Sequence, residues 1–387
     1  MDEKEGVNTL FYGNDLQRGR YPFSESSFSE QREISEWSKK GYQLLREDKV
    51  PDAIDYFSKI LTIDSENNYA LVGMGDANRK RGSFRDAIIF YQRCLDSHAN
   101  NNYALFGLAD CYKALNQHQK AIEIWEQYLL HDDKNLTVLT RVADAYRKIK
   151  DFRHSKNVYL QVLEMEENNP YAIIGLGHLH YDFKEYEVAL YYWNKMLVIK
   201  DGNVDIRVLT SIGNCYRKLK TFEEGINYFK YALERDPCNF YALFGIADCY
   251  RGLNCQEQSL EYWNIILKQD PRNKVILTRA GDAYRHSYKY EMAVEYYNRA
   301  LNIEFDIYAV LGLAVVARIQ GRYGEAIESL QRLIQQDPHN YRFYVELAEC
   351  FMANGEKSRA VNLLEGLLQG GARSKLVNDY LEMIQAV

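Results

Sequence analysis

The stretch Tyr103-Ala104-Leu105-Phe106-Gly107-Leu108-Ala109-Asp110-Cys111-Tyr112 returns with a single change as Tyr241-Ala242-Leu243-Phe244-Gly245-Ile246-Ala247-Asp248-Cys249-Tyr250. Such self-similarity indicates tandem copies of one structural unit. Sliding the chain against itself gives ten repeats of mostly 34 residues, which cover 34–67, 68–101, 102–135, 136–169, 170–205, 206–239, 240–273, 274–306, 307–340 and 341–374. We expect residues 1–33 to form a flexible N-terminal tail, and the repeats leave no room for a separate catalytic domain.

Two small residues recur at fixed places in every repeat, where position 1 is the first residue of the repeat. Position 8 carries Gly41, Gly75, Ala109, Ala143, Gly177, Gly213, Ala247, Gly281, Ala314 and Ala348, and position 20 is Ala, Ser or Gly throughout. A turn residue such as Gly82 lies between them. This spacing predicts two antiparallel helices in close contact, with bulky side chains such as Trp125, Trp193 and Trp263 at position 24 wedged around it.

The pattern resembles the tetratricopeptide repeat family, whose motif is W-L-G-Y-A-F-A-P at positions 4, 7, 8, 11, 20, 24, 27 and 32. The position 32 proline appears only as Pro237, Pro271 and Pro338, which affects local packing. The resemblance implies an all-α fold, a right-handed α-solenoid superhelix of about ten antiparallel helix pairs, with the first helix of each pair lining an inner groove. An apolar stripe that includes Val377, Leu381 and Ile384 predicts a C-terminal capping helix over 375–387.

Composition excludes several classes of protein. Of the 387 residues, 47% are hydrophobic and 26% are charged, which is typical of a folded chain. The net charge of −6 argues against a protein that coats nucleic acid, and no apolar run is long enough for membrane insertion. The acidic N-terminus lacks the apolar core of a secretory signal, and the seven cysteines include no C-x-x-C pair. These features favour a cytoplasmic protein.

No catalytic, cofactor or metal motif is visible, so we expect a non-enzyme without a cofactor or a bound metal. The P-loop, H-E-x-x-H and G-x-S-x-G patterns are absent. His178 and His180 would point apart on a helix. The cysteines at position 10 fit a small packed site and are interpreted as structural: Cys111, Cys215, Cys249 and Cys350.

The candidate partner-binding residues form one stripe on the predicted first helices, because positions 2, 5, 9 and 12 fall within roughly 80° of one another at about 100° per residue. Arginines at position 6 lie close by. The set comprises Tyr69, Tyr103, Tyr171, Tyr241 and Tyr308 at position 2; Phe106, Thr140, Thr210, Phe244 and Thr278 at position 5; Arg141 and Arg279 at position 6; Asp76, Asp110, Asp144, Asn214, Asp248 and Asp282 at position 9; and Arg79, Lys113, Arg147, Arg217, Arg251, Arg285 and Arg318 at position 12.

Two interpretations of this stripe compete. In one, each aspartate pairs with the arginine three residues later and the groove is merely solvated. In the other, which we favour, tyrosines and arginines form a binding surface of the kind enriched at interaction hot spots. Basic residues outnumber acidic ones here, so the preferred partner is an acidic protein or peptide segment. An RNA-associated helical repeat protein is the alternative, although the aspartates would repel phosphates and no nucleic acid is expected.

Two further questions stay open at this stage. The glycine at position 6 of several repeats, as in Gly107 and Gly245, has two explanations: close packing of helices, or close approach of a ligand backbone. The tail is net negative and rich in aromatic residues, including Phe11 and Tyr12. It could therefore dock in the groove or promote self-association, which the ends of the solenoid could also mediate.

Overall fold

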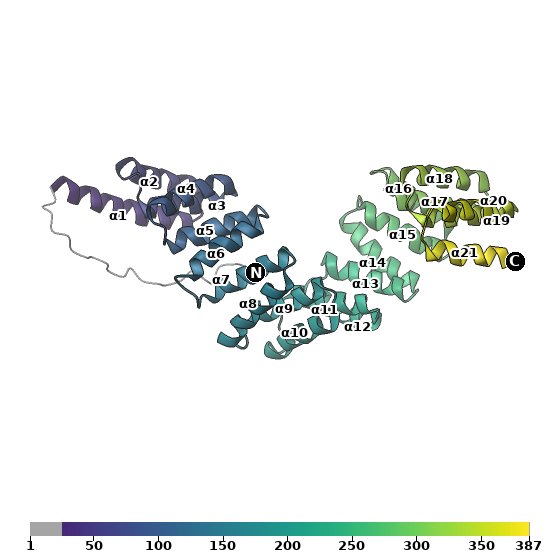
Figure 1. Cartoon of the computed structure of the whole chain (residues 1–387), viewed down its shortest axis with the longest axis horizontal. Coiled ribbons are helices and arrows are strands. Elements are labelled where there is room, and N and C mark those ends of the chain that lie inside the picture. The colour runs from purple at the N-terminus through teal and green to yellow at the C-terminus, as the bar shows by residue number, and fades with distance from the viewer. Residues whose placement is uncertain (1–24, 387) are drawn as a thin grey trace. The chain divides into compact units, whose positions relative to one another are not determined.

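The structure is a computed structural model that describes residues 25–386 and shows helices joined by short turns (Figure 1). Hypotheses about residues 1–24 lie outside the described residues. The helices of residues 25–386 are α1 (Glu25–Arg46), α2 (Val50–Ile63), α3 (Asn68–Lys80), α4 (Phe84–Ser97), α5 (Asn102–Ala114), α6 (His118–Leu129), α7 (Leu136–Lys148), α8 (Phe152–Met165), α9 (Pro170–Asp182), α10 (Tyr186–Ile199), α11 (Ile206–Leu219), α12 (Phe222–Arg235), α13 (Phe240–Gly252), α14 (Gln256–Gln269), α15 (Lys274–His286), α16 (Tyr290–Leu301), α17 (Ile307–Ile319), α18 (Tyr323–Gln336), α19 (Tyr341–Ala353), α20 (Lys357–Gln369) and α21 (Lys375–Ala386).

The chain forms two compact bodies, which we describe separately. The N-terminal body ends at Glu167 and holds α1 to α8, and the C-terminal body begins at Asn168 and holds α9 to α21. In both, successive helices pack as pairs, and each pair packs on the next. The all-α fold of paired helices predicted from the repeats is therefore present, whereas the right-handed superhelix stays a prediction.

Side-chain caps explain where the first helix of most repeats begins. From the second repeat on, this helix starts at the residue from which the repeat was counted, as at Asn68, Asn102 and Phe240. In six of these nine helices an asparagine stands just before the first residue, and its side-chain oxygen accepts a hydrogen bond from a backbone N–H of the first turn. Asp205 and Asp306 do the same for α11 and α17, whereas Asn340 before α19 makes no such bond. For Asn67 the donor is Ala70 N at 3.1 Å. Such a cap satisfies a backbone donor that the helix itself cannot, so it fixes the start of the helix.

The turn inside every repeat uses one left-handed residue at position 15. Ten residues there have φ between 58° and 80°, namely Asp48, Gly82, Asn116, Lys150, Lys184, Lys220, Asn254, Tyr288, Gly321 and Gly355. This conformation is easy for glycine and tolerated by asparagine and aspartate, but it is strained for lysine and tyrosine. The tertiary packing of the helix pair therefore overrides the local preference of those four residues.

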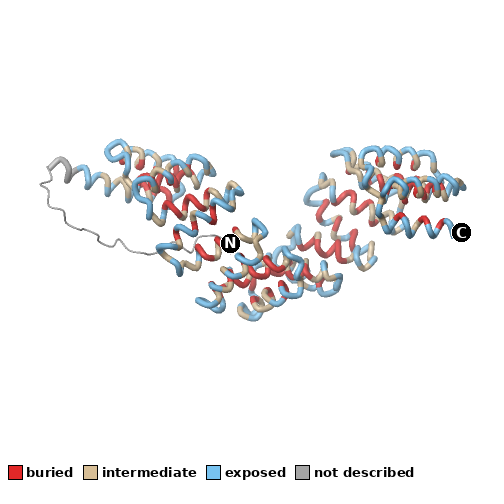
Figure 2. The backbone as a smooth tube through the Cα atoms, viewed as in Figure 1, coloured by how far each residue is buried: buried red, intermediate tan, exposed pale blue. Residues whose placement is uncertain are grey.

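The core is built from aromatic rings that fill the space left by small residues. Buried residues run along the interior of both bodies (Figure 2), and Trp125, Trp193 and Trp263 are 0% exposed. A Cβ added at Gly177 would lie 2.2 Å from Trp193 Nε1, so the small residue at position 8 is required by the ring at position 24. The close helix pairs predicted from positions 8 and 20 follow from this fit.

The glycines at position 6 serve the same purpose between repeats. A Cβ at Gly107 would lie 2.3 Å from Cζ of Tyr91, and one at Gly245 would lie 2.3 Å from Cζ of Phe229. Each ring belongs to the preceding repeat. Close packing, and not the approach of a ligand backbone, therefore accounts for these two glycines.

The N-terminal end of the repeat array differs from the prediction, whereas the C-terminal end has the predicted helix. Helix α1 begins at Glu25, so residues 25–33 extend the first helix and are not part of a flexible tail. The sequence hides this because residues 25–33 lack a clear helical period. At the other end, α21 packs against α19 and α20 with Val377, Leu381 and Ile384 buried, which is the arrangement expected of a capping helix.

Candidate functional site

In three repeats the predicted Asp–Arg pair at positions 9 and 12 is joined by a tyrosine hydroxyl. The hydroxyl of Tyr91 donates to Asp76 Oδ1 at 2.7 Å, and Arg79 lies 3.1 Å from the same oxygen. Tyr159 with Asp144, and Tyr297 with Asp282, repeat the contact at 2.6 and 2.7 Å. Burial, with a smaller effect of the aspartate charge, raises the pKa of Tyr297, so the hydroxyl keeps its proton and remains a donor. Three of the pairs within a repeat that the first interpretation required are therefore present: Asp76 with Arg79, Asp144 with Arg147 and Asp282 with Arg285.

The sixth repeat lacks both the hydroxyl and the carboxylate of this arrangement. Position 24 is Phe229 and position 9 is Asn214. The amide oxygen of Asn214 still accepts two hydrogen bonds from Arg217, at 3.2 and 3.1 Å. Because the amide is neutral, the positive charge of Arg217 is not cancelled within its own repeat.

Arg217 instead reaches the next repeat, where three guanidinium groups surround one carboxylate. Asp248 lies 2.6 Å from Arg217, 2.6 Å from Arg251 and 3.1 Å from Arg279. These residues come from α11, α13 and α15, and we call the four residues the Asp248 cluster. The Asp248 side chain is 8% exposed, whereas that of Arg251 is 46% exposed. The carboxylate therefore lies beneath guanidinium groups that reach solvent.

Aromatic rings and charge hold this cluster in place. The Arg279 guanidinium lies 5.0 Å from the centroid of Phe244 and 5.9 Å from that of Trp263. Burial raises the pKa of Asp248, but Arg251, Arg279 and Arg217 outweigh burial and bring it below its usual value. Burial together with the neighbouring arginines also lowers the pKa of Arg279, although Asp248 acts in the opposite direction. Positive charge is thus in excess around one carboxylate.

The N-terminal body contains a related but more balanced arrangement around Asp110. Arg141 lies 2.6 Å from Asp110, and Arg79 lies 3.6 Å from it. The Arg141 guanidinium lies 4.9 Å from the centroid of Phe106, as Arg279 does over Phe244. We call Arg79, Asp110 and Arg141 the Asp110 cluster. Here Arg79 is shared with Asp76, so two carboxylates face two guanidinium groups.

The predicted tyrosines at position 2 are all exposed. Their exposed fractions run from 58% to 74%, for Tyr69, Tyr103, Tyr171, Tyr241 and Tyr308. Lys113 is also exposed. An exposed ring of this size with a hydroxyl at its tip can supply both apolar area and a hydrogen bond to a partner.

Other predicted residues form hydrogen bonds or ion pairs within the protein. Thr210 and Thr278 are buried; the Thr210 hydroxyl donates to the carbonyl of Arg207 and the Thr278 hydroxyl to Asp306 Oδ2, so we withdraw both as partner contacts. Thr140 is half-buried and donates to the carbonyl of Thr137. Arg147 and Arg285 are about as buried, at 14% and 13% exposure, because they lie beside their own tyrosine and aspartate. Periodicity places all of these on one face but cannot show how far each projects.

Arg318, the last basic residue of the stripe, has acidic neighbours. It lies 2.6 Å from Glu349 and 3.4 Å from Glu346, both on α19. Its charge is thus neutralised by the tenth repeat, and the basic surface ends before α17.

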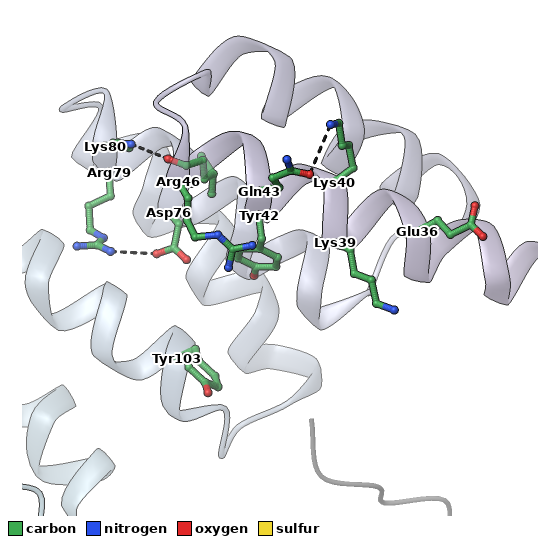
Figure 3. Close-up of a pocket in the computed structure, with 11 residues that line it drawn as sticks. Glu36, Lys39, Lys40, Tyr42, Gln43, Arg46, Asp76, Arg79, Lys80 and Tyr103 are labelled. Atoms are coloured by element: carbon green, nitrogen blue, oxygen red, sulfur yellow. Dashed lines mark hydrogen bonds and ion pairs between the residues drawn. The ribbon is translucent and has the colours of Figure 1, made fainter. Parts of the chain in front are cut away.

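A pocket of about 960 Å³ in the N-terminal body adds residues that the repeat pattern missed (Figure 3). Lys39, Lys40 and Arg46 of α1 line it together with Arg79 of α3 and Tyr103 of α5. The first repeat was left out of the stripe because it lacks the Asp–Arg pair. Basic residues at its positions 6 and 13 were the signal that could have included it.

Several cysteine and histidine side chains of the first helices are packed or hydrogen-bonded within the protein. Burial raises the pKa of Cys111, Cys215 and Cys249 to about 12, so these thiols remain protonated and packed. His180 Nδ1 lies 2.5 Å from Glu185, and within residues 25–386 no group of three His, Cys, Asp or Glu side chains could hold a metal ion. None of the helices in that range is long and apolar enough to cross a membrane.

Comparison with protein families identifies matches in both bodies. Profiles described as tetratricopeptide repeat match residues 103–132, 136–169, 206–238, 276–307 and 317–377. No curated protein matches this chain.

Solved structures with similar helical repeats include three that differ in how much of the chain they cover. MamA shares 25% identity over 45% of this chain and 93% of its own, with a TM-score of 0.39. A tetratricopeptide repeat protein from Parabacteroides merdae shares 16% identity over 71% of this chain and 94% of its own, with a TM-score of 0.40. Yeast Tom70 shares 13% identity over 92% and 96%, with a TM-score of 0.41.

Proposed function

Because the chain belongs to the tetratricopeptide repeat family, whose repeats generally serve as protein-interaction scaffolds, we propose that it binds an acidic segment of another protein along its first helices. The binding surface comprises the exposed tyrosines and the two arginine clusters. The scaffold is non-catalytic and acts in the cytoplasm. Its partner contributes carboxylate side chains and an extended or helical backbone.

The distribution of charge is the observation that carries this proposal. The whole chain has a net charge of −6. Helices α11, α13 and α15 nevertheless carry seven Lys or Arg residues and two aspartates. Helices α3, α5 and α7 carry six and three. Surfaces with an excess of one charge attract partners of the opposite sign and repel others.

The exposed tyrosines supply the second component of the surface. Each stands at the start of a first helix, one residue after the repeat begins. A partner that covers several of these rings would bury apolar area, with hydrogen bonds from the hydroxyls setting its register. Many modest contacts of this kind give affinity without a deep pocket.

The test uses fluorescein-labelled degenerate peptide libraries and the full chain, with binding followed by fluorescence anisotropy. We expect an acidic library to bind and a basic library not to bind. Raising the salt concentration severalfold should weaken the acidic complex by about tenfold, since surface charges are screened. Replacing Arg217 and Arg251 together by Gln should cause a loss of about tenfold.

A matched control removes the same charge from second helices. Lys230→Gln combined with Lys268→Gln should leave binding unchanged, because both lysines are exposed and lie outside the first helices. Equal binding of acidic and basic libraries would refute the proposal. A labelled single-stranded RNA that bound more tightly than the acidic library would also refute it and would favour the RNA alternative.

A further inference from the structure

The Asp248 cluster has more positive charge than one carboxylate of a partner can neutralise. Three guanidinium groups lie within ion-pair distance of one Asp248 carboxylate, and Asn214 contributes no charge. On the neighbouring helix, Asp282 is already engaged by Arg285 and by the hydroxyl of Tyr297. The surplus is therefore two positive charges at one place on the first helices.

The guanidinium groups also retain donors for a ligand. Asp248 accepts from one N–H nitrogen each of Arg217 and Arg279 and from two of Arg251. A guanidinium has five N–H donors in a planar fork. The exposed fractions of Arg217, Arg251 and Arg279 are 21%, 46% and 30%, so all three are accessible. Stacking of Arg279 on Phe244 fixes the orientation of one fork.

We propose that the Asp248 cluster binds a phosphorylated side chain of the partner segment. A phosphate monoester carries about −1.5 to −2 charges at neutral pH and three acceptor oxygens, which suits a surplus of two charges and several arginine forks. A single carboxylate would leave one charge uncompensated. The Asp110 cluster has a smaller surplus, because Arg79 is shared between Asp76 and Asp110 and the exposed Lys113 takes the place of Arg251. This proposal rests on the proposed function, since it assumes that a partner segment lies along the first helices.

The test compares two labelled peptide libraries that differ only in their central residue, phosphoserine or glutamate, at constant ionic strength. With the full chain, the phosphoserine library should bind about tenfold more tightly, reflecting the added charge-assisted hydrogen bonds. Inorganic phosphate should compete more effectively with the phosphoserine library than acetate does. Equal affinity for both libraries would overturn the phosphate site and leave the proposed function standing. Binding of neither library would overturn both.

Two variants test whether the preference for phosphoserine comes from the Asp248 cluster. Arg251→Gln should reduce the preference for phosphoserine to about twofold or less, whereas Lys268→Gln on α14 should preserve it. Asn214→Asp combined with Phe229→Tyr rebuilds the tyrosine–aspartate–arginine contact of the second, fourth and eighth repeats, so the chain should remain folded by circular dichroism. The added carboxylate should lower the preference by about threefold, as one more charge competes for Arg217. An unchanged preference in either variant would overturn the proposal.

Discussion

The Asp110 cluster and the Asp248 cluster use the same parts with different charge. Each has a buried or nearly buried aspartate at position 9, an arginine from the preceding repeat and an arginine from the following repeat stacked on a phenylalanine. They differ at position 12 of their own repeat, which is Lys113 in one and Arg251 in the other. They also differ one repeat upstream, where Asp76 with Tyr91 in the N-terminal body corresponds to Asn214 with Phe229 in the C-terminal body.

That difference shows how a repeat protein can alter a surface without altering its fold. Removing the tyrosine hydroxyl would leave the aspartate without one hydrogen bond, and the asparagine avoids that cost. The two changes therefore make sense only as a pair. Their result at the surface is the release of one arginine toward the next repeat.

The largest expected effect tests whether the hydrophobic cores beneath the two clusters contribute equally to the free energy of unfolding. Trp125→Ala and Trp263→Ala should each lower the free energy of unfolding by about 3–5 kcal/mol, because both rings are fully buried. Trp193→Ala should behave in the same way. Urea unfolding followed by circular dichroism provides the measurement. A clear difference between Trp125→Ala and Trp263→Ala would break the equivalence of the two sites.

A smaller effect is expected at the glycines beside these cores. Gly107→Ala and Gly245→Ala should each cost about 1–3 kcal/mol, since the new Cβ would press against a ring of the preceding repeat. Gly324→Ala is the control, because nothing lies within 4 Å of its Cβ position in α18. It should stabilise the protein by about 0.5–1 kcal/mol in the same unfolding assay. Stabilisation by all three changes would contradict this explanation, because it would show that the rings do not restrict positions 107 and 245.

The paired change can be measured directly in the eighth repeat. Tyr297→Phe should cost about 1 kcal/mol, because Asp282 loses a hydrogen bond of 2.7 Å. Adding Asp282→Asn, which recreates the combination of the sixth repeat, should recover part of this loss. A double-mutant cycle from urea unfolding gives the coupling energy. Strict additivity of the two changes would contradict the proposed link between hydroxyl and carboxylate.

The smallest expected effect is on the stability of the protein at acidic pH. Since the folded pKa of Asp248 is lowered, its ion pairs stabilise the protein above the ordinary carboxyl pKa of about 3.9. That stabilisation is lost as the pH falls through the lowered value. Between pH 7 and pH 3 the parent should therefore lose more stability than Asp248→Asn. Parallel loss in both proteins, measured by urea unfolding across this range, would contradict the assignment.

The helix pairs were accessible from sequence because they depend on local packing that repeats. Each glycine at position 8 faces the aromatic ring at position 24 of its own repeat, and ten copies of the pattern make the small positions visible. The start of α1 was missed because residues 25–33 precede the first repeat and lack a clear helical period. Periodicity identified the stripe. It did not show that the tyrosines are exposed while several of the arginines form ion pairs within the protein.

This difference between the tyrosines and the arginines depends on contacts between repeats. The partner of Arg217 lies 31 residues away at Asp248, and nothing in the position 9 or 12 pattern distinguishes it from a partner three residues away. Likewise, the buried Thr278 donates a hydrogen bond to Asp306 of the following repeat. A helical angle indicates a face, whereas the depth of a side chain on that face is determined by its neighbours.

Asp248 also has a consequence for how the array unfolds. In a simple linear array each repeat senses only the repeats beside it, and melting can stop at any boundary. Asp248 joins an arginine of the sixth repeat to one of the eighth, so a break on either side of the seventh repeat disturbs the same carboxylate. Because these ion pairs link repeats that are two apart, the smallest segment that can unfold by itself is longer than a single repeat. Hydrogen exchange in α11, α13 and α15 should consequently report one shared opening event.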